Sequence, residues 1–328
     1  MGAELSGMEF SNAYGIAPEG TSVTKTAFYS FATFYREDGT VLEGAASQGG
    51  RSVIARALLS EKVYCRLDRA DAAAREAMRL AQPNFFLTFD RLGIDPFTQR
   101  FAVTLLAEGT VRGTGGIRIT GDDCSTTVPG LYAAGDAATR ELICGGFTGG
   151  GSHNAAWAIA SGTWAGRGAA RHAFSLGFRA GTRRVAAAGG AGLRPTGTPG
   201  PADGFRDVIA AVQGEVLPYE KNYLRQGDRL TASLEVLDSV WEEARASLHA
   251  DGGDTVRARQ AAAMAAHARW MYASALARTE TRGMAKRLDH PAQDPGQHHR
   301  IVTGGLDRVW TRTEPLPVAP AAPLEVAS

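Results

Sequence analysis

The residues from 115 to 162 combine an acidic group, glycine-rich turns and a helix start in a pattern that suits a nucleotide-like ligand. Gly130 to Asp136 reads as a short strand of small residues ending in Gly135 and Asp136. Gly135 lets the backbone approach a ligand, and the Asp136 carboxylate can accept hydrogen bonds from sugar hydroxyls, as on a ribityl chain. This part of the pattern predicts one wall of a dinucleotide site.

A second group of glycines comes directly before a predicted apolar helix, residues 155 to about 173. Ser152 or Asn154 is the expected N-cap, which would leave backbone N–H groups and the positive end of the helix dipole for an electron-rich ligand edge. The alternative is a capped helix behind a flexible glycine loop. The residues predicted to line the ligand here are Gly151, Ser152, His153, Asn154 and Ala155.

Five blocks of the sequence resemble the FAD-dependent flavoproteins of the succinate dehydrogenase and fumarate reductase family, which includes L-aspartate oxidase and adenylylsulfate reductase. TTVPGLYAAGDAA at 126–138 resembles the second flavin fingerprint, and GGGSHNAAWAIASG at 149–162 resembles the helix start that faces the flavin pyrimidine edge. The other blocks are GTGGIRI at 113–119, GAELSGMEF at 2–10 and RTETRGMAKRLDHPAQDP at 278–295. They follow one another in family order.

The resemblance implies an FAD cofactor and a fold of three parts. The expected class is α/β plus α+β: an incomplete, Rossmann-like FAD-binding domain, an α+β cap and a C-terminal helical bundle. Gly115 and Gly116 lie in the strand that re-enters the flavin domain, so the resemblance adds them to the cofactor-binding residues. It also places Arg278, Glu280 and Arg282 near the junction of the bundle with the other parts, where they could equally be solvated or bridging charges.

The family begins with a Rossmann unit whose GxGxxG turn seats the FAD pyrophosphate, and this sequence contains no GxGxxG. By the resemblance, Met1 aligns with an internal family position, about 200 residues in on domain size. We therefore expect a truncated chain: a fragment, a misplaced gene start, or one piece of a split flavoprotein. In the last case a separate chain would supply the Rossmann segment.

The clamp that binds a dicarboxylate in fumarate reductases and succinate dehydrogenases is missing by comparison with the family. Tyr14 stands in the His-Pro-Thr segment, no RGEGG segment exists, and Val111 and Gly149 replace a His and an Arg. A four-carbon dicarboxylate needs cationic, bidentate donors. We therefore expect a small-molecule substrate other than succinate or fumarate.

Three residues remain as catalytic candidates beside the predicted flavin face: Glu108, Arg112 and His153. Glu108 and Arg112 could instead form an ion pair that only stabilises the strand end. His153 could be a capping or packing histidine, because lone histidines are more often structural than catalytic. Tyr14 and Lys25 are expected at the mouth of the cap.

Composition indicates a folded protein and excludes several classes. The 328 residues are 44% hydrophobic with a net charge of +1, and no basic stripe suggests nucleic acid. The apolar runs are interrupted by His or Arg, so no membrane span is expected, and Glu4 and Glu9 argue against a signal peptide. Three isolated cysteines without CxxC spacing favour the cytoplasm and no metal or iron–sulfur site in this chain.

The domain division follows from these patterns. Residues 1–24 and 109–182 are expected to form the partial FAD-binding domain, and 25–108 the cap, with a hairpin turn at 36–39, a helix at 71–82 and a strand at 101–106. The segment 183–204 is rich in Gly, Pro and Ala and is predicted to be a mobile linker. Two amphipathic helices follow in a helical domain at 205–300, before a tail at 301–328.

Two function classes fit the sequence. The first is an FAD-dependent oxidoreductase that transfers a hydride at flavin N5, with a ferredoxin-like or iron–sulfur protein as electron partner. The second is a non-catalytic remnant or assembly subunit that keeps the fold but does not hold FAD alone. A GxGxxG segment encoded directly upstream would favour the enzyme.

Overall fold

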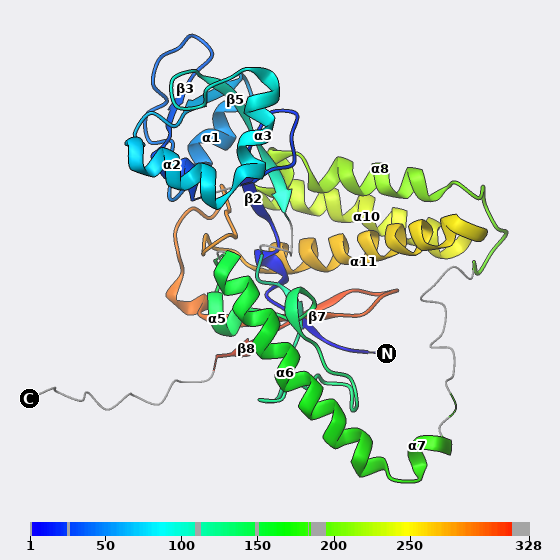
Figure 1. Ribbon diagram of the computed structural model, residues 1–328. Coiled ribbons are helices and arrows are strands. Elements are labelled where there is room, and N and C mark those ends of the chain that lie inside the picture. Colours follow the sequence, from blue (N-terminus) through cyan, green and yellow to red (C-terminus); the bar gives the residue numbers. More distant parts are fainter. Residues whose placement is uncertain are drawn as a thin grey trace, which may run out of the picture.

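The computed structural model describes residues 2–24, 27–108, 113–147, 151–182, 184 and 195–316, without the side chains of 151 and 152. Figure 1 shows three parts: a cap in blue and cyan, a bundle of long helices in yellow-green to gold, and a sheet with α6 beneath them. As expected, the fold is mixed α/β, with two four-stranded antiparallel sheets.

The cap is built on the sheet ordered β2-β5-β4-β3. Phe101–Glu108 (β5) confirms the predicted strand, and Asp71 caps the predicted helix, Ala72–Ala81 (α2). The turn at 36–39 is present, with Tyr35 bridged to Val41. Many of the residues in the core of the cap are aromatic. The other cap elements are β2 (Ala13–Pro18), η2 (Phe28–Phe31), β3 (Thr33–Tyr35), α1 (Arg51–Ala57), β4 (Val63–Arg66) and α3 (Pro83–Leu92).

The division predicted at residue 25 needs correction, because β2 pairs with β5 from Tyr14 to Pro18. The chain enters the cap sheet at Ala13, twelve residues earlier than expected. The sequence of β2, AYGIAP, shows no alternation of apolar and polar residues, and all six residues are buried. A strand without such alternation carries little sequence signal for its sheet partner.

The second sheet has the order β6-β1-β7-β8 and joins the two ends of the chain. Leu5–Ser6 (β1) pairs with Gly116–Ile117 (β6) on one side and with His299–Gly304 (β7) on the other. Trp310–Pro315 (β8) pairs along the whole of β7. Residues 301–316 were predicted to be part of a tail, and the hairpin corrects this. The hairpin forms because its first strand buries Ile301, Val302 and Thr303, and because Gly305 adopts the positive φ that the turn requires.

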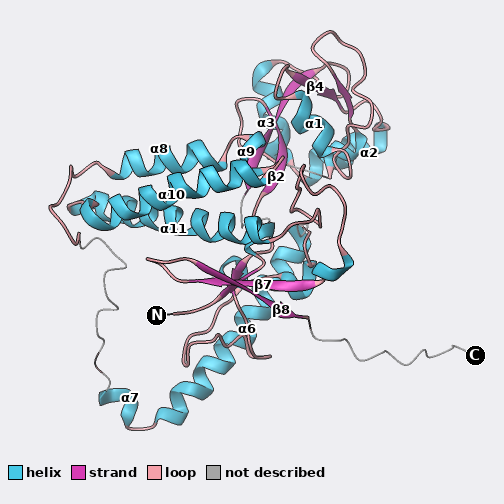
Figure 2. Cartoon of the chain, turned by 180° about the vertical axis from the view of Figure 1, so that it is seen from behind, coloured by secondary structure: helices cyan, strands magenta, loops and turns pink. Residues whose placement is uncertain are grey.

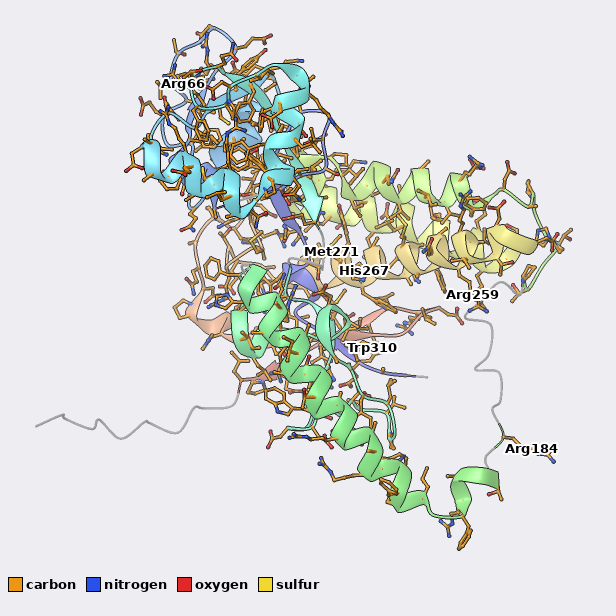
Figure 3. All side chains as sticks on the ribbon, viewed as in Figure 1. Arg66, Arg184, Arg259, His267, Met271 and Trp310 are labelled. Carbon is orange, nitrogen blue, oxygen red and sulfur yellow. The ribbon has the colours of Figure 1, made fainter. Side chains whose placement is uncertain are left out.

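The bundle consists of α8 (Phe205–Val216), α10 (Gly227–Ser247) and α11 (Thr255–Ala277), which lie side by side in Figures 1 and 2. The sequence predicts one apolar stripe of Leu230, Leu234, Leu237 and Trp241 and another of Met264, Ala268, Met271 and Ala275. All of these residues are buried in the bundle core except Leu234 and Met264, which are partly buried against it. Figure 3 labels Met271 and His267 on α11 and Trp310 on the hairpin that α11 contacts.

Residues 195–204, the described end of the predicted mobile linker, are held against α10. The N–H of Gly197 donates to the Ala246 carbonyl at 2.9 Å, and that of Gly200 to the Ser247 carbonyl at 2.8 Å. The short helices in the rest of the chain are η1 (Met8–Phe10), η3 (Gly135–Ala137), α5 (Glu141–Cys144), α7 (Arg179–Thr182), α9 (Tyr219–Asn222), η4 (Gly252–Asp254) and η5 (Pro295–Gln297).

Candidate functional site

The turn at Gly135 is locked to the long helix α6, Gly151–Leu176. The Gly135 N–H donates to Ser161 Oγ at 2.9 Å, and Trp157 Nε1 donates to the Gly135 carbonyl at 3.0 Å. Gly135 has a φ of 59°, a left-handed conformation that favours glycine. Both backbone groups of this turn are therefore satisfied by one helix, which fixes the direction of the next residue, Asp136.

The predicted strand from Gly130 to Asp136 is not a regular strand. Tyr132 forms one bridge with Ser125, and η3 begins at Gly135. In the described part of the chain this segment is paired on one side only, with residues 124–126, so it lacks the second neighbour that would extend a ladder. Sequence reasoning found the segment but not its conformation.

Asp136 is oriented by Arg140, one turn further along. Arg140 is 2% exposed and donates from Nη1 to Asp136 Oδ1 at 3.0 Å, while its Nη2 donates to the Gly113 carbonyl. The Asp136 side chain is 53% exposed. A half-exposed carboxylate held by a buried cation keeps lone pairs for an outside donor. This fits the sugar-like ribityl part of a flavin.

The amino end of α6 differs in detail from the prediction. The helix already includes Gly151, so Ser152 and Asn154 lie in its first turn and neither is the N-cap. His153 and Ala155 are exposed there, and Asn154 is half-buried. Gly149, in the predicted loop, lies outside the described residues. The first-turn N–H groups and the positive dipole end of α6 suit an electron-rich ligand edge, as expected of a long helix.

Gly115 and Gly116 are packed against protein backbone. A Cβ on Gly115 would stand 2.7 Å from the Gly7 carbonyl oxygen, and one on Gly116 would stand 2.6 Å from the Ala138 carbonyl carbon. Close approach of three chain segments therefore explains both glycines. A contact of either residue with flavin stays a prediction.

The catalytic candidates lie on different elements. Glu108 ends β5 in the cap, where Thr24 Oγ1 donates to Glu108 Oε1 at 2.6 Å. His153 is on α6, and Arg112 and Lys25 lie outside the described residues, so the choice between catalysis and an ion pair for Glu108 and Arg112 stays open. Tyr14 is not at the mouth of the cap: it is 1% exposed, and its hydroxyl donates to the Val216 carbonyl at 2.9 Å.

A buried charge cluster joins the first and last blocks of the family resemblance. Arg278 is 1% exposed and lies between the carboxylates of Glu9 and Glu280, each 2.8 Å away. Arg282 approaches Glu280 Oε1 at 2.5 Å from the other side. These charges bridge rather than face solvent. Burial raises the pKa of Glu9; for Glu280 burial is outweighed by bonds from Arg282, the Asp294 N–H and Arg278, which hold its pKa low.

A second buried cation, Arg225, supports the same segment. It donates from Nη1 to the Glu9 carbonyl at 2.6 Å and from Nη2 to Asn222 Oδ1 at 2.9 Å. Burial lowers the pKa of this guanidinium to about 10. Glu9 is therefore held by two arginines from the C-terminal third of the chain, its carboxylate by Arg278 and its backbone carbonyl by Arg225.

Sequence reasoning missed Arg140, Trp157 and Ser161. All three hold the Gly135–Asp136 turn, and one spacing gave a usable signal: Ser161 follows Trp157 by four residues on α6. Residues four apart on a helix share a face. The polar members of that face on an otherwise Ala-rich helix mark its contact with the turn.

One flank of α6 is uncovered in the described structure. Ile159 is 73% exposed and Phe174 85% exposed, and nothing lies within 4 Å of the positions that a Cβ would take at Gly162 and Gly166. An apolar helix flank of this extent usually marks a contact surface.

The described residues contain no group of three or more His, Cys, Asp or Glu side chains able to hold a metal ion. Among the described helices, none combines the length and the apolar character needed to cross a membrane.

Ser161→Ala should destabilise the protein by about 1–3 kcal/mol, because it leaves the Gly135 N–H without its acceptor. Thr163→Ala is the matched control. Both hydroxyls donate to the carbonyl four residues earlier, but only the Ser161 hydroxyl also accepts a hydrogen bond from the Gly135 N–H. Urea unfolding of both variants measures the difference. Equal midpoints for the two variants would contradict the lock.

Glu280→Gln should cost about 3–5 kcal/mol at neutral pH, because two arginines lose their shared carboxylate. The folded-state pKa of Glu280 is lowered, so its contribution is complete above its unfolded pKa of about 4.3 and is lost as pH falls through the folded value. The gap between wild type and variant in denaturant unfolding should therefore shrink below about pH 4. Exposed Glu235→Gln is the control; a gap independent of pH would reject this assignment.

Comparison with known proteins gives concordant results. A model of the fumarate reductase flavoprotein C-terminal region matches residues 215–311. L-aspartate oxidase of Caulobacter vibrioides is 32% identical over 257 residues, 77% of this chain and 42% of that protein. E. coli quinol fumarate reductase FrdA has a TM-score of 0.73 at 17% identity, over 98% of this chain and 61% of that one.

Adenylylsulfate reductase from Archaeoglobus fulgidus has a TM-score of 0.66 at 14% identity, over 96% of this chain and 60% of that one. The chain thus spans about two to three fifths of the length of these relatives. The structural likeness shows a shared fold. Residues 215–311 of this chain carry the C-terminal flavoprotein domain of the succinate dehydrogenase and fumarate reductase family, and the chain has the fold of those flavoproteins.

Proposed function

We propose that the chain is part of an FAD-dependent oxidoreductase and supplies the wall beside the ribityl chain and pyrimidine edge of the flavin. The observation that carries this proposal is the Gly135–Asp136 turn locked onto α6. FAD, when bound, would accept or release a hydride. The chain's own residues would bind and orient it.

Each part of this wall has a separate task. Asp136 accepts hydrogen bonds from the ribityl hydroxyls, and Arg140 keeps its carboxylate in one orientation. The N–H groups in the first turn of α6 stabilise partial negative charge on the pyrimidine edge. His153 is exposed in that turn, and we assign its side chain to the same edge. Glu108 and Arg112 are the proposed groups that hold or move a proton on the substrate side.

We further propose a substrate other than succinate or fumarate. Val111 and Gly149 stand where the family resemblance would require His and Arg, and no RGEGG segment supplies another cation. A dianion in a partly desolvated site needs paired cationic donors. In the segments that correspond to the clamp, Arg112 supplies a single cationic donor where a pair is needed.

The remaining part of the cofactor site is assigned to a partner. The sequence has no GxGxxG turn for the FAD pyrophosphate, and the uncovered flank of α6 offers an apolar surface for the segment that contains one. We propose that this Rossmann segment is on a separate chain or encoded in frame upstream, and that an iron–sulfur or ferredoxin-like protein exchanges electrons with the flavin in the cytoplasm.

A second candidate function rests on the same missing turn. Without pyrophosphate contacts the chain could serve as a non-catalytic remnant or an assembly subunit of a split flavoprotein. Flavin retention by the assembled protein separates the two functions. Absence of any GxGxxG segment in frame or in the adjacent gene favours the remnant.

The chain alone should bind FAD weakly or not at all, and co-expression with the upstream GxGxxG polypeptide should restore binding. In that complex Asp136→Ala should lower flavin affinity roughly 10–100-fold, since a charge-assisted hydrogen bond is lost. Exposed Asp203→Ala is the control. Flavin absorbance after dialysis is the measurement; stoichiometric FAD on the isolated chain, or full retention by Asp136→Ala, would contradict the assignment.

The flavin-loaded complex should not oxidise succinate or reduce fumarate. Loss of each paired cation from a buried carboxylate site costs about 3–5 kcal/mol, so the missing clamp should remove both activities. Dye-coupled assays with both dicarboxylates, beside enoyl, ketosteroid-like and α-hydroxy compounds, make the test. Robust dicarboxylate turnover that disappears in Arg112→Ala would show that this cap has rebuilt the clamp.

A further inference from the structure

The short helix α9, Tyr219–Asn222, connects two helices of the bundle, yet Tyr219 and the two residues after the helix pack in the core of the cap. Tyr223 and Leu224, which follow it directly, are 4% and 3% exposed within the aromatic cluster of the cap, and Tyr219 packs against that cluster. Figure 2 shows α9 beside β2, at the cap end of the bundle. The main bundle core contains none of these three residues. A segment of the bundle thus completes the core of another part.

Tyr219 takes the place of a missing strand neighbour. On β5, the partner strand β4 pairs only with residues 101–103, so Leu105 lies beyond its end. The Tyr219 hydroxyl accepts from the Leu105 N–H at 3.1 Å, and it lies 3.1 Å from the Leu105 carbonyl and 2.9 Å from Thr104 Oγ1. One side chain therefore satisfies backbone groups that an open strand edge would leave to water.

Tyr14 makes the reciprocal connection from the cap to the bundle. Its hydroxyl donates to the Val216 carbonyl at the end of α8, and its ring meets those of Tyr219 and Tyr223 edge to face at 5.8 and 5.4 Å. Burial raises the pKa of Tyr14, so the hydroxyl keeps the proton that it donates. The cap therefore bonds to the bundle through Tyr14 on β2, and the bundle bonds to the cap through Tyr219 on α9.

The far end of α9 is fixed to the flavin-domain side. Asn12, directly before β2, donates to the Asn222 carbonyl at 2.9 Å, and Arg225 donates to Asn222 Oδ1 and to the Glu9 carbonyl. α9 thus spans from the open edge of β5 to the segment that carries Glu9. A change in the angle of the cap must break bonds at one of these ends.

We propose that α9 sets the angle of the cap relative to the rest of the molecule, and that Tyr219 is the positioning residue. Its hydroxyl fixes β5 at Leu105, three residues before Glu108, and so places the end of the strand that carries this candidate acid. The consequence for chemistry rests on the proposed function. The positioning itself can be tested without flavin.

The test measures cap orientation in the purified full chain. In a Cys144→Ser background, where the other two cysteines are buried, spin labels at exposed Ala77→Cys on α2 and Ala232→Cys on α10 report the cap-to-bundle distance by double electron–electron resonance. Tyr219→Phe removes only the hydroxyl. Tyr223→Phe is the matched control, because its hydroxyl has just a 3.5 Å contact with Ser52.

Tyr219→Phe should broaden the distance distribution and speed amide exchange at Leu105 about tenfold, as expected for one lost hydrogen bond. Tyr223→Phe should leave both as in wild type. A variant that is only less stable would unfold at a lower temperature, but well below that temperature it would keep the distance distribution of the wild type. An unchanged distribution and exchange rate in Tyr219→Phe, or equal broadening in both variants, would overturn the proposal.

If Tyr219→Phe does not fold, Thr104→Val provides the second variant, because it removes one partner of the hydroxyl and leaves α9 intact. Faster exchange at Leu105 in Thr104→Val supports the proposal, and wild-type exchange overturns it. Flavin plays no part in either measurement. Failure to bind FAD therefore bears on the proposed function alone.

Discussion

The ion pairs of Arg278 are the constraint on which the arrangement of the three parts depends. This cation is almost fully buried, and it holds Glu9 before the cap and Glu280 after the bundle helix α11. It also donates to the carbonyls of Gln297 and His299, where the second sheet begins its β7 strand. A buried charge that loses its partners costs several kcal/mol, so the three parts cannot separate here without a large penalty.

A chain of contacts leads from these ion pairs towards the proposed flavin wall. The Arg278 guanidinium lies over the ring of Phe10, 5.3 Å from its centre, and Phe10 contacts Gly146 in the loop before α6. The N–H of Met284 donates to the Gly146 carbonyl at 2.7 Å. The turn at Gly146 is therefore held by the segment that follows Arg278. This explains why a family signature in the last third of the chain accompanies a flavin fingerprint in the middle.

Local patterns in the sequence predicted the elements but not their partners. Apolar stripes at helical spacing predicted α10 and α11, and the segments 71–82 and 101–106 were expected to form the helix and strand observed as α2 and β5. Each of these predictions concerns a single element. Glu9 and Arg278 are 269 residues apart, and Tyr14 and Val216 are 202 apart. No periodicity links such positions. The hairpin at 299–315 was taken for a tail because its buried residues are few and its strand partner, β1, lies at the other end of the chain.

The same distinction applies to the site. Asp136 and the start of α6 were recognisable because glycine and acid occur at a fixed spacing, whereas Arg140, Trp157 and Ser161 act through contacts that only the folded chain reveals. These contacts complete the wall beside Asp136 but leave one flank of α6 uncovered. If the segment that binds the FAD pyrophosphate also covers that flank, cofactor affinity and the stability of α6 are thermodynamically linked. Each would then rise with the other, and a substitution at exposed Ile159, which makes none of the hydrogen bonds that hold the proposed flavin wall at Asp136, would weaken cofactor binding through the loss of the partner.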